Sequence, residues 1–110
     1  MTERIILFPN VSSAEANVYA ENLAGEIRDI DESVQVKKRR TNSEAMDFGA
    51  SLVIILGSAS ASAIASGIAS WMTRHSGVRL EIRNKSGELV AANLDSKDAA
   101  AITESFSESK

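Results

Sequence analysis

The chain has 110 residues, of which 44% are hydrophobic and 25% charged, a balance typical of one globular domain and unlike that of a disordered segment. Its net charge of −3 disfavours a dedicated nucleic-acid-binding role, because such domains normally carry a basic excess. The absence of cysteine excludes disulfide bonds and thiolate metal ligands. We therefore expect residues 1–110 to form a single domain, with a frayed polar tail at 107–110.

The N-terminal part predicts a strand, a helix and a second strand. Residues 5–8 form a short apolar run that Pro9 ends, which is typical of a buried strand. Ser12 and Glu15 have the spacing of a capping box, so a helix is expected to begin there. Residues 34–36 alternate between apolar and polar and predict the second strand. The apolar face of the helix consists of Ala16, Tyr19, Ala20, Leu23, Ile27 and Ile30.

Residues 37–47 are predicted to be a polar connecting segment. It opens with a basic run, Lys37, Lys38, Arg39 and Arg40. Such a run is most often a solvated strand end or loop. If exposed, it would also suit a trypsin-like protease, or it would meet anionic lipid with a gain of about 1 kcal/mol per residue.

Residues 48–73 contain no charged side chain and are rich in alanine, serine and glycine. We expect one long helical segment, or a helical hairpin broken near Gly57. Residues 52–56 also fit a buried strand, because short apolar runs are ambiguous. On a helical wheel, bulky side chains gather on one face and small ones elsewhere. The bulky face holds Ile64, Ile68, Trp71 and Met72. The predicted interface on the small-residue face comprises Ser58, Ser62, Ala63, Ser66, Gly67 and Ser70.

Three roles fit this uncharged stretch. It packs on the sheet of an ordinary soluble domain, it forms an interface with a second copy or a partner, or it spans a membrane. Its serines reduce the transfer energy into lipid, and only residues 52–56 are continuously hydrophobic. A serine stripe opposite a bulky stripe would nevertheless suit a helix that lines a water-filled pore.

The C-terminal part predicts a β-hairpin followed by a helix. Residues 78–82 alternate between apolar and charged, as expected for a half-buried strand. Residues 84–87 form the hairpin loop, in which Gly87 suits a position of positive φ, and residues 89–94 return as the partner strand. A cap at 95–96 begins the last helix. The predicted fold is α+β, a four-stranded mixed sheet with packed helices in the order β-α-β-α(α)-β-β-α.

The residue pattern does not predict an enzyme, a metal site or a cofactor. His75 is the only histidine, and at a helix end beside Arg74 we expect it to satisfy terminal carbonyl groups rather than bind a metal. The serines lie in no G-x-S-x-G motif. The glycines match neither a P-loop nor a dinucleotide-binding fingerprint.

Small and apolar residues at set distances run through residues 46–94. They are Gly49 and Ala50, then Leu56, Gly57 and Ser58, then Trp71 and Arg74, and finally the strand at 78–82 and Gly87. This pattern resembles the effector-associated constant component family of bacterial conflict systems, over about half of the chain. Met72 and Thr73 depart from it, because a leucine and a basic residue are expected after the tryptophan.

The resemblance implies a non-catalytic accessory component of a bacterial anti-phage defence system. The chain would act as an adaptor or self-assembling module through residues 48–73, with partners that are further copies, or a co-encoded effector, protease or NTPase. Gly49, Gly57, Trp71 and Gly87 would be architectural. The alternative is a membrane-disrupting effector, in which residues 48–72 insert as an oligomeric pore after activation by cleavage at 37–40. The apolar run at 5–8 is too short for a signal peptide, so we expect a cytoplasmic protein that is membrane-associated only when activated.

Overall fold

The fold is taken from a computed structural model, which describes residues 3–9, 11–40, 50–75 and 77–106, without the side chains of Ser13, Arg40 and Ala50. The elements are, in chain order, β1 (Glu3–Leu7), α1 (Ser13–Ile30), β2 (Gln35–Arg40), β3 (Ala50–Ile55), α2 (Ala61–Thr73), β4 (Leu80–Asn84), β5 (Leu89–Leu94) and α3 (Ala99–Phe106).

The strands form one five-stranded sheet in the order β2-β3-β1-β4-β5, and every neighbouring pair is antiparallel. The α+β class is confirmed. The predicted four-stranded mixed sheet and its element order are wrong, because residues 50–55 form a strand and not part of a helix. The apolar run at 52–56 is too short for its periodicity to distinguish a helix from a strand. The β-branched side chains of Val53, Ile54 and Ile55 favour a strand.

The first six elements have the connectivity β-α-β-β-α-β of ferredoxin-like domains. Both β1 and β2 pair with β3, which lies between them, and both β3 and β4 pair with β1. The hairpin to β5 adds a strand beside β4, and α3 follows it. The fold by itself assigns no function, because this architecture supports many.

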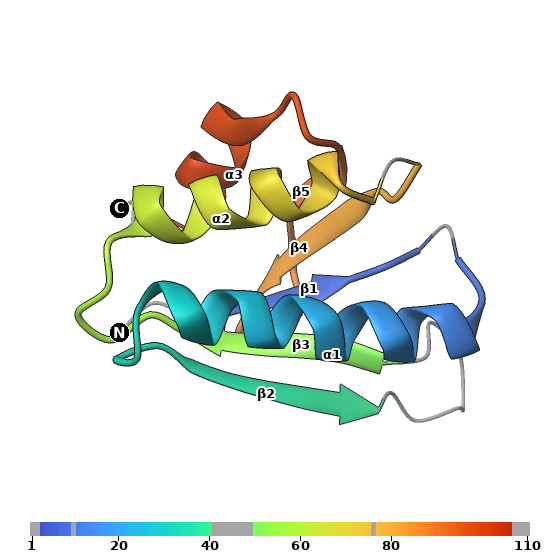
Figure 1. The fold of residues 1–110 in the computed structure, drawn as a ribbon, viewed down its shortest axis with the longest axis horizontal. Coiled ribbons are helices and arrows are strands. Elements are labelled where there is room, and N and C mark those ends of the chain that lie inside the picture. Colours follow the sequence, from blue (N-terminus) through green and yellow to red (C-terminus); the bar gives the residue numbers. More distant parts are fainter. Residues whose placement is uncertain (1–2, 10, 41–49, 76, 107–110) are drawn as a thin grey trace.

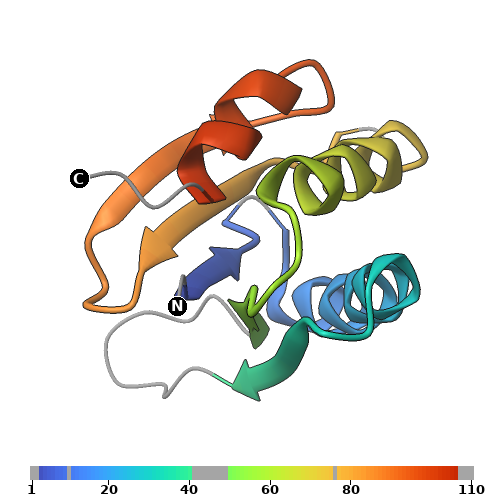
Figure 2. The same ribbon diagram turned by 90° about the vertical axis from the view of Figure 1, so that its left-hand side faces the viewer.

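The molecule has two layers, with the helices on one side of the sheet (Figure 2). Helices α1 and α2 lie next to each other on that side, and α3 packs beside α2 and β5 (Figure 1). The core lies between the layers and is apolar. Its largest fully buried side chains include Ile6, Phe8, Leu23, Ile27, Leu52, Ile54, Ile64, Ile68, Trp71, Leu80 and Phe106.

Local signals begin and end several of these elements. The predicted capping box of α1 is confirmed, since the Glu15 amide donates to the Ser12 hydroxyl at 3.1 Å and the Ser12 amide donates to the Glu15 carboxylate at 3.3 Å. Gly87 closes the β4–β5 hairpin with φ of 91° and donates its amide to the Asn84 carbonyl. Helix α3 begins at Ala99, later than the cap expected at 95–96.

Gly57 follows β3 in a left-handed conformation, with φ of 61°. A β-carbon built at this position would lie 2.9 Å from the carbonyl oxygen of Ser33, in the turn between α1 and β2. Both the backbone conformation and the space therefore require glycine here. The chain turns at this point from β3 towards α2.

We predict that Gly57→Ala lowers the free energy of unfolding by more than Gly87→Ala. Both positions have positive φ, which costs a non-glycine residue about 1–2 kcal/mol. Only position 57 adds a close contact with backbone, since a β-carbon at position 87 meets nothing within 4 Å. Urea denaturation followed by the fluorescence of the buried Trp71 measures both variants. Equal losses would show that the Ser33 carbonyl moves aside at little cost.

Candidate interaction surface on helix α2

Helix α2 is short and carries no charged residue from Ala61 to Thr73. Ser60 caps it, accepting a hydrogen bond from the Ala63 amide at 3.3 Å. Ser58 lies before the helix, in the turn after β3. The predicted long helix over 48–73 is thus divided between a strand and a helix of three to four turns.

The two faces of α2 differ in side-chain size. The inward face buries Ile64, Ala65, Ile68, Ala69, Trp71 and Met72. The outward face is exposed and holds Ser62, Ala63, Ser66, Ser70 and Thr73. We call these five residues the outer face of α2. Ser58 is exposed as well, so five of the six residues of the predicted interface lie at the surface.

The neighbouring helix α1 has the ordinary polar surface of a globular protein. Its exposed positions include Glu15, Glu21, Arg28 and Asp29. Because α1 and α2 pack side by side on one layer, a charged surface borders an uncharged one (Figure 1). The outer face of α2 is therefore distinct from its surroundings in charge as well as in side-chain size.

Gly67, the sixth residue of the predicted interface, belongs to a contact inside the molecule. It is half-buried, and a β-carbon built on it would lie 2.1 Å from Cδ1 of Ile30 at the end of α1. The absence of a side chain thus lets α1 and α2 approach each other. About two turns further on, Arg74 pairs with Glu26 of α1 at 2.8 Å. These contacts cover the side of α2 that faces α1.

An aromatic cluster holds the C-terminal end of α2. Trp71 is fully buried and donates its indole N–H to the Asn22 side chain at 2.8 Å. His75 stacks on the indole with ring centroids 4.3 Å apart, and its Nδ1 lies 2.8 Å from the Trp71 carbonyl oxygen. Tyr19 meets both rings edge-on. The expectation that His75 satisfies a terminal carbonyl is confirmed.

The basic run lies on the edge strand β2, so the prediction of a connecting segment from residue 37 is wrong for 37–40. The strand extends to Arg40 because residues 37–40 continue the pairing with β3, from Lys37 opposite Val53 to Arg40 opposite Ala50. Lys38 is tied to α1, because its ammonium group lies 2.7 Å from Glu21 and 2.8 Å from Asn17. The hydrogen bond from the Lys38 ammonium group lowers the pKa of the Glu21 carboxyl. Lys37 and Arg39 are exposed.

The side chain of Arg40, residues 41–47 and Gly49 lie outside the described part of the structure. The same holds for Phe48 and for the predicted tail at 107–110. What the sequence pattern indicates for these residues remains a prediction.

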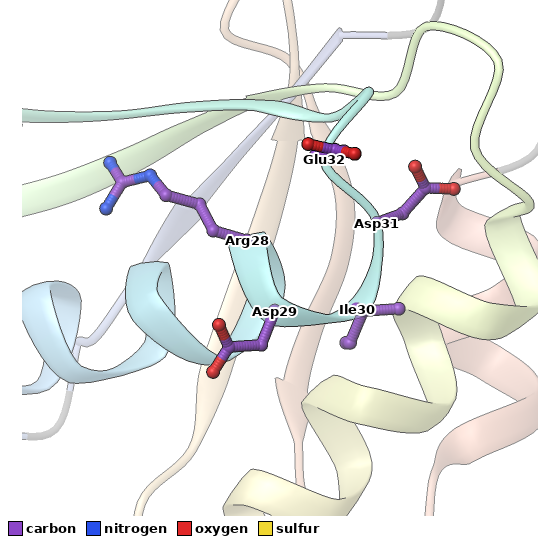
Figure 3. A pocket seen from close by; sticks show the side chains of 5 residues that line it. All are labelled: Arg28, Asp29, Ile30, Asp31 and Glu32. Carbon is purple, nitrogen blue, oxygen red and sulfur yellow. The ribbon is translucent and has the colours of Figure 1, made fainter.

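A shallow pocket lies at the end of α1 and the turn that follows it (Figure 3). It is lined by Arg28, Asp29, Ile30, Asp31 and Glu32. Its carboxylates do not converge, since Asp29 and Asp31 point to different sides of the turn (Figure 3). Asp31 accepts hydrogen bonds from the amide and the hydroxyl of Ser33, both at 2.9 Å, and these lower its pKa. Within the described residues, no group of acidic or histidine side chains is arranged to hold a metal ion.

The sheet face that points away from the helices combines apolar and charged side chains. Leu7 and Val53 are buried there although they lie outside the main core cluster. Arg83 and Glu81 form an ion pair at 2.6 Å on β4. The centre of this face therefore offers little exposed apolar surface.

The large exposed apolar side chains of the described residues are Val18 on α1 and Leu89 and Val90 on β5. No sequence pattern indicated that these three side chains are exposed. The place of residues 89–94 after the hairpin loop predicts a strand but not that this strand lies at the edge of the sheet. The exposure of Leu89 and Val90 follows from the position of β5 at the edge of the sheet, which the order of the strands sets.

Among the helices of the described residues, none combines the length and the apolarity needed to cross a bilayer. Comparisons of the chain with protein-family models, with curated proteins and with solved structures gave no match. The family resemblance therefore remains a prediction from the residue pattern.

We predict that Gly67→Leu lowers the free energy of unfolding by about 1–3 kcal/mol, the usual cost of overpacking. The new side chain would occupy the space of the Ile30 side chain. Ala63→Leu is the matched control on the same helix, and we expect it to change stability by less than about 0.5 kcal/mol because Ala63 is exposed. Thermal denaturation followed by circular dichroism measures both.

The double variant Gly67→Leu with Ile30→Ala tests the cause of that loss. If the contact is responsible, the two changes are non-additive and the double variant is more stable than the sum predicts. Additive losses would show that Gly67 is required for another reason.

We predict that the Asp31 carboxylate makes stability depend on acidic pH. Its pKa is lowered in the folded chain by the Ser33 amide and hydroxyl. The contribution is therefore complete above the unfolded-state pKa, about 4, and is lost as the pH falls through the lower folded-state value. Asp31→Asn should be less stable than the wild type at neutral pH, and the difference should shrink in acid. A difference that is constant with pH would contradict this assignment.

Proposed function

We propose that this chain is a non-catalytic interaction module that acts as an adaptor or a self-assembling component. The observation that carries the proposal is the outer face of α2, which is exposed, uncharged and built from small side chains. A surface helix ordinarily places charged and long polar residues opposite its buried face, as α1 does. Helix α2 does not.

Such a face is suited to contact with another protein for two reasons. Charged groups lose hydration when an interface closes, and interface centres are accordingly depleted of them. Short side chains lose little conformational entropy on burial and let a partner's backbone come close. The Ser62 hydroxyl lies 3.1 Å from that of Ser60, and the Ser70 hydroxyl accepts from Arg74 at 3.4 Å. A hydroxyl can donate one hydrogen bond and accept two, so these groups and that of Ser66 have capacity for a partner.

The biological setting proposed is that of the family resemblance, a bacterial anti-phage defence system. The partner would be a co-encoded effector, protease or NTPase, or a further copy of this chain. The fold supports such a role without specifying it, because the bulky face of α2 is used inside the domain and the outer face is left for binding.

The membrane-disrupting alternative takes second place. It requires residues 48–72 to leave the domain together, and these include β3, which is paired with β1 on one side and β2 on the other. Removing β3 would break both ladders and expose Leu52 and Ile54, which are fully buried. Nothing comparable is needed for binding through the outer face of α2.

We predict that Ala63→Arg and Ser66→Arg abolish binding to a co-encoded partner and leave the domain folded. A long charged side chain at the centre of the contact would prevent close approach and lose its hydration. Ala14→Arg is the matched control, since Ala14 is also exposed and lies in the first turn of its helix, α1. Binding of each variant to the purified co-encoded protease, NTPase or effector is measured by calorimetry, with circular dichroism as the check on folding.

Unchanged binding in both α2 variants would overturn the proposed surface. If the wild type binds none of these proteins and also does not self-associate, the adaptor role itself fails. Dye release from vesicles of anionic phospholipid, measured before and after limited trypsin treatment, tests the alternative. Release that depends on cleavage would favour a membrane effector.

A further inference from the structure

We draw no further inference here: the strongest candidate, the exposed surface patch of Lys37 and Arg39 on the edge strand β2, carries none because nothing in the structure shows what covers it.

Discussion

The pairing of β3 on both of its edges, with β2 on one side and β1 on the other, is the constraint on which the rest of the structure depends. It pairs with β1 along 52–55 and with β2 along 50–55, so both of its edges are used. Leu52 and Ile54 are fully buried and join the main core. Because this strand draws on the uncharged stretch, only the remainder, from Ala61 onward, is left to form a helix. The change of direction between them is made at Gly57, whose backbone and surroundings both require the absence of a side chain.

The orientation of α2 follows from what its inward face has to fill. Trp71 buries a large side chain between the layers and fixes its position through the Asn22 side chain. Gly67 lets the same helix lie close to Ile30 of α1. With these contacts satisfied, the helix has no freedom to rotate its serines inward. The small side chains therefore face solvent as a consequence of core packing, and they provide an uncharged surface without any cost to the core.

Much of the local structure could be predicted from the sequence, because short-range signals determine it. The Ser12–Glu15 box, the hairpin at 84–87 and the role of His75 each depend on residues within a few positions of one another. The failure at 52–56 has a physical origin. A short apolar run fits a buried strand and a buried helix equally, and only its pairing with β1 and β2, distant in sequence, decides between them.

The candidate surface was harder to define from the sequence than the helix that carries it. The helical wheel separated bulky from small residues on α2 correctly, and five of the six interface residues are exposed. It could not show that Gly67 faces α1, because the wheel contains no information about the neighbouring helix. No sequence pattern indicated that the side chains of Leu89 and Val90 are exposed. Their exposure depends on the strand order, which places β5 at the border of the sheet.

The two edges of the sheet are protected in different ways. An antiparallel sheet that is not closed must end somewhere, and each end presents unpaired backbone groups. In this chain one end carries consecutive basic residues on β2, whereas the other carries the exposed Leu89 and Val90, and the pairing of β5 with β4 is irregular at two places, at Asn93 and at Val90. Such irregularities protect an edge strand, since they bend it away from a continuous ladder. A fully flat and uncharged edge would instead favour open-ended aggregation.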